Sequence, residues 1–124
     1  MGSDDSVKIL IIDDSPLVRT ILHEYLAETG YQVFEAGTIL DANIIFAKEL
    51  PEIVIKDLFM PDSDTVETIR CFKKVNPQVK IIICSTGSSK EHILNGLKAG
   101  AEEFVLKPLE KDQVISVIKR IAAS

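Results

Sequence analysis

Short runs of apolar residues recur along the chain, and several of them end abruptly in polar or charged residues. The runs are rich in Val, Ile and Phe, which is typical of strands that are buried on both faces of a parallel sheet. The predicted strands cover residues 7–12, 31–36, 53–57, 79–84 and 103–106. Between them apolar residues recur at helical spacing, which predicts one helix after each strand.

Strict alternation of five strands and five helices predicts a parallel sheet with right-handed crossovers and helices on both faces. The second helix, over residues 38–50, is expected to turn three apolar side chains toward the core: Leu40, Ile44 and Ala47. Ser88, with Glu91 three residues later, has the pattern of a capping box at the start of the fourth helix.

Length and composition bound the class of protein. A chain of 124 residues fits one domain, which we assign to residues 7–123 after an N-terminal tail over 1–6. The net charge of −5 argues against direct binding of nucleic acid or an anionic membrane, because both require clustered Lys and Arg.

No apolar run is long enough to span a bilayer and no signal peptide is evident, so a soluble, cytoplasmic protein is expected. Cys71 and Cys84 lack CxxC spacing, which favours two reduced, partly buried thiols over a disulfide or zinc site.

Four of the predicted strands end beside side chains that carry chemistry: Asp13 and Asp14, Asp57, Ser85 and Lys107. The carboxyl ends of parallel strands meet at one edge of the sheet, where ligands of open α/β folds bind. Clustered carboxylates stay ionised near neutral pH only if a cation neutralises them, and hard oxygen ligands suit Mg²⁺. A site with so few protein ligands can gain oxygens from a phosphoryl group, so Asp57 is a candidate nucleophile that forms an aspartyl phosphate.

Each of these signals has an ordinary alternative when it is taken alone. Adjacent aspartates are common in turns, a serine after a strand often caps a loop, and a Lys-Pro pair often forms a solvated turn. His23 and His92 fall on helical positions without a partner motif and are expected at the surface. The predicted topology places the independent signals at one edge, and this favours the phosphoryl-transfer interpretation.

The chain resembles the receiver domains of two-component response regulators, in particular the chemotaxis-type (CheY-like) single-domain proteins. The resemblance covers residues 7–123 and rests on motifs in a fixed order: Asp13-Asp14, Asp57 followed by Met60-Pro61, Ser85, Gly100-Ala101, and Phe104 before Lys107-Pro108. It implies a flavodoxin-like, doubly wound five-stranded parallel sheet of order 2-1-3-4-5 with five helices, an order for which a chemotaxis receiver is a known example.

The resemblance also implies roles for individual residues. Asp57 corresponds to the phosphoacceptor, and Asp13 and Asp14 to the acidic pair that binds Mg²⁺ together with Asp57 and the backbone carbonyl of Phe59. Lys107 corresponds to the lysine that pairs with the phosphoryl oxygens, and its bond to the following proline is typically cis in this family.

The implied switch residues are Ser85, whose hydroxyl moves toward the phosphate, and Phe104, the aromatic residue that then turns inward. The output face would consist of the fourth helix, the fifth strand and the fifth helix. The expected partners are a sensor histidine kinase or phosphotransfer protein upstream and an output protein or domain downstream, with no turnover of a metabolite.

Three positions depart from the commonest pattern of the family. Thr65 replaces a frequent glycine, so the turn after Met60-Pro61 is expected to differ, since a β-branched residue resists a positive φ. Thr86 occupies a position that usually carries a smaller residue. Phe59 is bulky and apolar, and we hypothesise that Phe59 and Thr86 slow the gain or loss of phosphate.

Two other functions remain open from the sequence. A phosphatase of the haloacid dehalogenase type would also use an aspartate nucleophile, but it usually has a second Asp two residues on, where this chain has Phe59. A phosphorylation-independent interaction domain is the other alternative, although the full set of acidic, hydroxyl and lysine residues argues against it.

Overall fold

The computed structural model describes residues 7–124 and contains one five-stranded parallel sheet. The strands are β1 (Lys8–Ile12), β2 (Gln32–Ala36), β3 (Ile53–Asp57), β4 (Lys80–Ser85) and β5 (Glu103–Leu106). Their order is β2-β1-β3-β4-β5 and every neighbouring pair is parallel, as predicted. The tail assigned to residues 1–6 lies outside the described residues.

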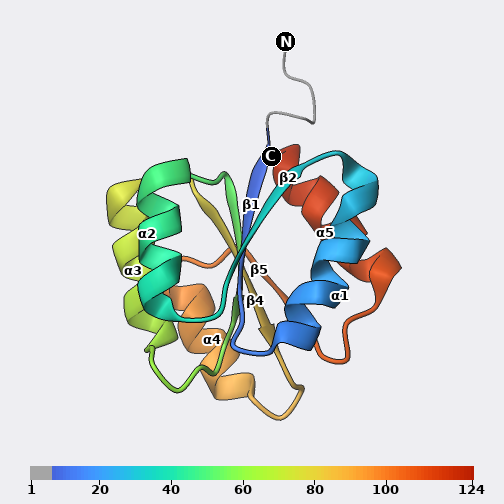
Figure 1. The fold of residues 1–124 in the computed structure, drawn as a ribbon. Coiled ribbons are helices and arrows are strands. Elements are labelled where there is room, and N and C mark those ends of the chain that lie inside the picture. Colours follow the sequence, from blue (N-terminus) through green and yellow to red (C-terminus); the bar gives the residue numbers. More distant parts are fainter. Residues whose placement is uncertain (1–6) are drawn as a thin grey trace.

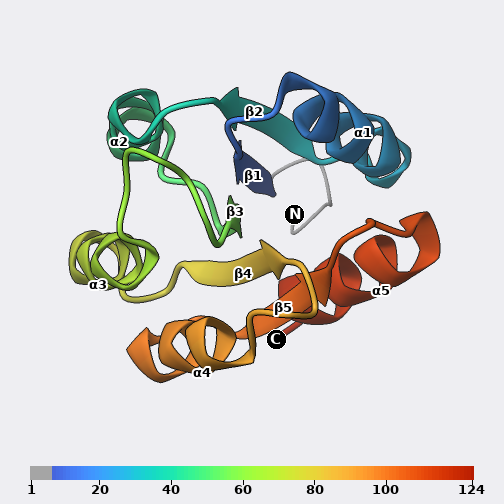
Figure 2. The same ribbon diagram turned by 90° about the horizontal axis from the view of Figure 1, so that it is seen from below.

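Helices cover both faces of the sheet. They are α1 (Pro16–Leu26), which continues into the 3₁₀ turn η2 (Ala27–Thr29), α2 (Ile39–Glu49), α3 (Thr65–Val75), α4 (Lys90–Ala99) and α5 (Lys111–Ala122). Figures 1 and 2 show α2, α3 and α4 on one side of the sheet and α1 and α5 on the other. Two hydrophobic clusters fill these layers, one under each group of helices, and the sheet separates them. None of the helices between residues 7 and 124 is both long and apolar enough to cross a membrane.

The apolar runs form strands because the sheet buries both of their faces. The side chains of Ile9, Leu10, Ile11 and Ile12 in β1 are fully inaccessible, and β3 is buried along its whole length. Burial of this kind stabilises a domain by about 25 cal/mol for each Å² of apolar surface removed from water. The strand ends are therefore fixed by the core, and so are the polar residues that follow them.

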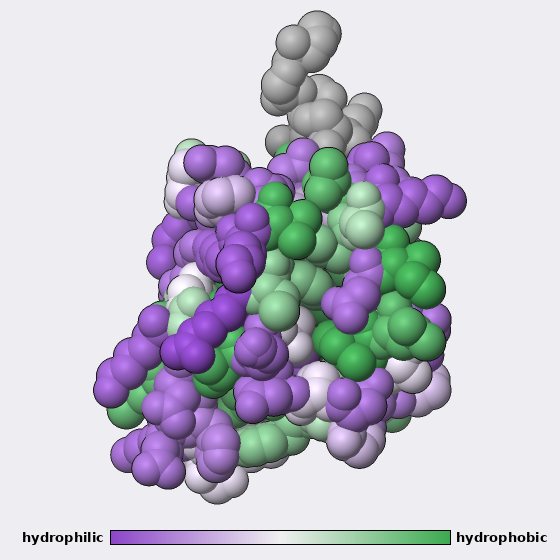
Figure 3. All heavy atoms as spheres, turned by 90° about the vertical axis from the view of Figure 1, so that its left-hand side faces the viewer, coloured by the Kyte–Doolittle hydropathy of each residue, from purple (hydrophilic) through white to green (hydrophobic). Residues whose placement is uncertain are grey.

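The predicted inner face of α2 was wrong. Leu40 and Ile44 are 67% and 58% exposed, and Ala47 is also exposed, whereas Ala42 and Phe46 are buried. The ring of Phe46 stacks on Phe72 of α3 with a centroid separation of 4.0 Å. Apolar residues occupy nearly every side of this helix, so their spacing alone does not select the buried side. On the side of the molecule that carries α2 and α3, hydrophobic residues gather on one flank and hydrophilic residues cover much of the rest (Figure 3).

Two smaller predictions also need correction. The capping box at Ser88 is absent, because α4 begins after Ser89, whose side chain makes no cap hydrogen bond, and the Ser88 hydroxyl instead lies 3.1 Å from that of Thr86. Cys71 is exposed rather than partly buried, while Cys84 is buried, and both thiols are free.

α4 lies close to the sheet at a glycine. A Cβ atom at Gly96 would overlap Cδ1 of Ile83, a fully buried residue of β4. The absence of a side chain at Gly96 therefore allows the backbone of α4 to approach the strand.

Candidate functional site

Three carboxylates meet at the carboxyl ends of β1 and β3. Carboxylate oxygens of Asp13, Asp14 and Asp57 all lie within 4.8 Å of one another. Asp13 and Asp57 are 2% and 9% exposed, whereas Asp14 is exposed. The parallel topology brings these residues together, because β1 and β3 are adjacent and end at the same edge. Figure 2 views the molecule from the side of this edge.

Asp13 is held in place by its own neighbours in sequence. Its Oδ1 accepts a hydrogen bond from the backbone N–H of Ser15 at 2.9 Å, and its backbone carbonyl accepts one from Nη1 of Arg19 at 2.7 Å. Ser15 in turn caps α1 by accepting from the Val18 N–H at 3.2 Å. The β1–α1 turn thus fixes one carboxylate oxygen of Asp13 and leaves Oδ2 to interact across the site.

Lys107 links the two buried carboxylates. Its Nζ lies 3.1 Å from Oδ2 of Asp13 and 3.2 Å from Oδ1 of Asp57. Burial lowers the pKa of Lys107, but the hydrogen bonds and charges of the two aspartates outweigh that effect and raise its pKa above the ordinary value. The ammonium group is therefore charged at neutral pH. The Lys107–Pro108 peptide bond is cis, as the resemblance implies.

Burial and the nearby carboxylate of Asp13 disfavour the ionised form of Asp57. Burial, followed by the charge of Asp13, raises the pKa of Asp57, while Lys107 and the backbone N–H of Phe59 act in the opposite direction. A cation next to this group would favour its ionised form and therefore its reactivity as a nucleophile.

The donor set fits Mg²⁺ in its chemistry. The three carboxylates are close enough together for one ion to bind all of them, and they supply hard oxygen atoms. The exposure of Asp14 leaves the cluster open to water and to a phosphoryl group. No thiol or imidazole belongs to the cluster, so softer metals have no preferred ligand there. The Phe59 carbonyl as a further ligand stays a prediction.

The predicted hydroxyl residues lie at the end of β4. Ser85 is buried, its hydroxyl donates to the backbone carbonyl of Thr86 at 3.2 Å, and its own carbonyl accepts from the Lys107 N–H at 2.7 Å. The backbone bond attaches Ser85 to the strand end that carries Lys107. Thr86 is exposed, with its hydroxyl next to that of Ser88.

Phe104 lies apart from the carboxylates, on the α4 side of β5. It is partly buried and lines an apolar groove of about 330 Å³ together with residues of α4 and β5, among them Ile93, Leu97 and Leu106. The groove lies on the face that the sequence predicts to be the output surface.

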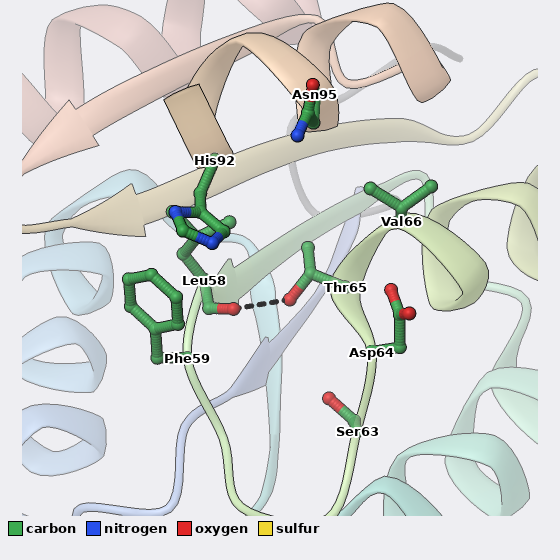
Figure 4. Close-up of a pocket in the computed structure, with 8 residues that line it drawn as sticks. All are labelled: Leu58, Phe59, Ser63, Asp64, Thr65, Val66, His92 and Asn95. Atoms are coloured by element: carbon green, nitrogen blue, oxygen red, sulfur yellow. Dashed lines mark hydrogen bonds between the residues drawn. The ribbon is translucent and has the colours of Figure 1, made fainter. Parts of the chain in front are cut away.

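Phe59 projects from the loop after β3 and is 52% exposed. Its ring meets that of His92, an exposed residue of α4, edge to face, with a centroid separation of 4.9 Å (Figure 4). Phe59 and His92 both line a pocket of about 330 Å³ between this loop and α4. The contact connects the loop that follows Asp57 to a helix of the predicted output face.

Sequence reasoning missed Lys56 and the hydrogen bonds that Thr65 makes behind the site. Lys56, the residue before Asp57, is 1% exposed, and Thr65, the first residue of α3, is also buried. Nζ of Lys56 donates to the carbonyl of Asp57 at 3.0 Å and to Oγ1 of Thr65 at 3.2 Å. Burial lowers the pKa of Lys56 to about 8, although the nearby aspartates, led by Asp57, raise it. A lysine inside an otherwise apolar strand was the available signal, because a buried ammonium group requires partners.

Comparisons with known proteins agree with this geometry. The family model described as response regulator receiver domain matches residues 9–119. The chemotaxis protein CheY of Thermotoga maritima is 30% identical over 93% of this chain and 97% of its own length. The sporulation initiation phosphotransferase F of Bacillus subtilis is 31% identical over 91% of each chain. The solution structure of the beryllofluoride-activated NtrC4 receiver domain dimer superposes with a TM-score of 0.87, at 27% identity, over 94% of this chain and 96% of that one.

Proposed function

Because the chain belongs to the response regulator receiver domain family, we propose that it is a Mg²⁺-dependent phosphorylation switch with Asp57 as the phosphoacceptor. The phosphoryl donor is a sensor histidine kinase or phosphotransfer protein, and the site of action is the cytoplasm. The observation that carries the proposal is the position of the Asp57 carboxylate, within 4.8 Å of oxygens of Asp13 and Asp14 and hydrogen-bonded to Lys107.

The proposed reaction is a transfer between a phosphohistidine and Asp57. A carboxylate oxygen of Asp57 attacks the phosphorus atom, and an O–P bond forms while the P–N bond breaks. The bonding electron pair returns to the imidazole nitrogen, which takes up a proton from solvent. In the second half of the cycle, water attacks phosphorus and the O–P bond to Asp57 breaks. Inorganic phosphate leaves, the proton lost by water passes to solvent, and Asp57 is again a free carboxylate.

The chain's own residues support each part of this reaction. Lys107 supplies a charged donor that already bridges Asp13 and Asp57, and it is placed to stabilise negative charge on the transferring group. Asp13, Asp14 and Asp57 would hold Mg²⁺, which would neutralise charge on the phosphoryl oxygens when it is bound. The hydrogen bonds to Asp13 from Ser15 and Arg19 keep that carboxylate oriented before the donor arrives.

The proposed output passes through Ser85 and Phe104 to the face formed by α4, β5 and α5. The Ser85 hydroxyl now donates to the backbone carbonyl of Thr86 at 3.2 Å, a weak bond that a charged phosphoryl oxygen could replace. Phe104 lines the apolar groove beside α4, so a change in its position would alter the surface offered to a partner protein.

Phosphorylation can be tested by intact-protein mass spectrometry after incubation with Mg²⁺ and acetyl phosphate. We expect one phosphoryl group on the wild-type chain, no adduct after omission of Mg²⁺, and no adduct on Asp57→Asn. Asp41→Asn, which changes an exposed aspartate of α2, is the matched control and should be labelled like the wild type.

Two results would contradict the proposal. One is the absence of an adduct on the wild-type chain, which would favour a phosphorylation-independent interaction domain. The other is an adduct that persists in Asp57→Asn. Steady, multiple turnover of a phosphoester would instead identify the chain as an enzyme.

A further inference from the structure

Lys56 and Thr65 form a closed set of hydrogen bonds behind the loop that follows β3. The Lys56 ammonium group donates to the Asp57 carbonyl and to the Thr65 hydroxyl, and the Thr65 hydroxyl donates to the Leu58 carbonyl at 2.6 Å. Figure 4 shows this last bond, which joins the start of α3 to the strand end. Sδ of Met60, 3.7 Å from Nζ, completes the surroundings of the ammonium group.

The bonds restrain two successive peptide groups. In the peptide between Asp57 and Leu58, the carbonyl accepts from Lys56 and the N–H donates to the carbonyl of Cys84 at 2.8 Å. In the peptide between Leu58 and Phe59, the carbonyl accepts from Thr65, and the N–H interacts with the Asp57 carboxylate. The same peptide therefore contacts the Thr65 hydroxyl at one end and the phosphoacceptor side chain at the other.

Thr65 is compatible with this turn because the turn does not require a left-handed residue. Among the described residues other than glycine, Leu50 has a positive φ, and Thr65 does not. Thr65 instead serves as the first residue of α3, directly after its N-cap Asp64. Its β-branched side chain is thus free to point back toward β3, where it meets the Leu58 carbonyl (Figure 4). There it also accepts a hydrogen bond from Lys56.

We propose that Lys56 and Thr65 are positioning residues that hold the backbone from Asp57 to Phe59 in the orientation that binds Mg²⁺. This inference rests on the proposed function, because it concerns the same site. Neither residue touches the phosphoryl group: they act through the two peptides that carry the Asp57 side chain and lead to the Phe59 carbonyl. Removal of either contact allows these peptides to rotate, and the ligands then lose their arrangement before the metal binds.

Thr65→Val tests the hydroxyl with almost no change in shape and none in charge, and Thr65→Ser is the matched control that keeps the hydroxyl. Mg²⁺ binding to the full chain is measured by isothermal titration calorimetry, without a phosphodonor, at a temperature where circular dichroism shows each variant to be folded. We expect Thr65→Val to weaken Mg²⁺ binding about tenfold, the low end of what loss of an outer partner costs a metal site, and Thr65→Ser to remain within about twofold of the wild type. The amide resonance of Phe59 should shift in Thr65→Val and not in Thr65→Ser.

Lys56→Met tests the other half of the pair in the same assay. A lysine that acted only through its charge would repel Mg²⁺, so its removal would strengthen binding. Loss of a positioning contact weakens binding instead, and this is the expected result. Because methionine fills a similar volume without a buried charge, the variant also serves if Thr65→Val fails to fold.

The outcomes separate this inference from the proposed function. A wild-type chain that binds no Mg²⁺ contradicts the proposed function itself. A wild-type chain that binds Mg²⁺, together with a folded Thr65→Val variant that binds it equally well or a Lys56→Met variant that binds it more tightly, overturns the inference alone. A purely structural role would lower the unfolding temperature of Thr65→Val and leave Mg²⁺ binding by the folded protein unchanged.

Discussion

Two lysines approach Asp57, and they differ in almost every respect. Lys107 comes from the end of β5, remains partly accessible, and donates to the carboxylates of Asp13 and Asp57. Lys56 comes from β3 itself, is 1% exposed, and donates to the backbone carbonyl of Asp57 and to Thr65. The first lies among the carboxylates, and the second lies behind the loop that follows β3.

The difference shows that the same ammonium group can be stabilised by nearby carboxylates at one position and destabilised by burial at another. The aspartates raise the pKa of Lys107 against the effect of burial, so its ammonium group stays charged beside the two carboxylates. For Lys56 burial dominates and lowers the pKa to about 8, so this ammonium group is held at a cost in folding free energy. A contact that is maintained at such a cost is expected to have a function in the folded state.

The largest expected effect comes from Lys107→Met. Loss of one preorganised donor at a reacting group typically costs about 10²- to 10³-fold in rate, so labelling by acetyl phosphate should slow by about 100-fold. Mg²⁺ binding should not weaken, because the substitution removes a positive charge from the cluster. The measurement is the initial rate of phosphorylation at saturating Mg²⁺, followed by mass spectrometry.

The control for this variant is Lys119→Met, an exposed lysine of α5, which should react at the wild-type rate. A Lys107→Met variant that is phosphorylated within a few-fold of the wild type would remove the distinction between the two lysines.

An effect of comparable free energy at most is expected on folding stability at high pH, and it depends on Lys56. The pKa of Lys56 is about 8 in the folded state, against an ordinary value of 10.5, so between these values the unfolded chain binds more protons than the folded one. The free energy of unfolding therefore rises as the pH increases from about 8 to about 10.5. The rise is at most about 3 kcal/mol, because each unit of difference in pKa corresponds to about 1.36 kcal/mol. Lys56→Met should lack this rise.

The quantity to compare is the difference in unfolding free energy between the wild type and Lys56→Met at each pH, measured by urea unfolding without Mg²⁺. Burial raises the pKa of Cys84 to about 12, so the folded chain retains a proton that the unfolded chain releases, and stability from Cys84 falls above pH 9 in both proteins. Subtraction cancels this contribution. Parallel pH profiles for wild type and Lys56→Met would show that the ammonium group is not destabilised by burial.

The smallest expected effect concerns Phe59 and the lifetime of the phosphorylated state. Phe59→Asn replaces an apolar side chain by one that can orient a water molecule, so hydrolysis should accelerate by roughly fivefold, the value of one hydrogen bond of about 1 kcal/mol. Phe59→Leu keeps an apolar side chain and should retain a lifetime close to that of the wild type. Equal lifetimes in wild type and Phe59→Asn would refute the role assigned to Phe59, and Thr86→Ala provides the corresponding test for Thr86.

The fold and the charged residues at the strand ends could be predicted from the sequence, because burial of the apolar runs fixes where each strand ends. Once the apolar runs are placed in parallel strands, the residues that follow them must meet at one edge, and Asp13, Asp57 and Lys107 do. The cis bond before Pro108 came from the family resemblance rather than from the pattern of residues.

The rest depended on tertiary contacts that residue spacing does not encode. In α2 the apolar residues surround the helix, and the buried side is the one that carries Ala42 and Phe46, whose ring stacks on Phe72 of α3. Lys56 was overlooked because its partner, Thr65, lies nine residues away, across a loop whose path is unknown from the sequence. Thr65 was noted only as a departure from glycine, and its hydrogen bonds explain what the side chain does there.

Gly96 determines how closely α4 packs against the sheet. At this residue the fully buried Ile83 of β4 fills the space that a side chain would need. Toward one end lies His92, in contact with Phe59 of the loop after Asp57, and toward the other lies Gly100, whose φ of 127° ends the helix. Because α4 meets β4 at Gly96 and the loop after β3 at His92, a side chain at position 96 would shift the helix relative to the loop that carries Phe59.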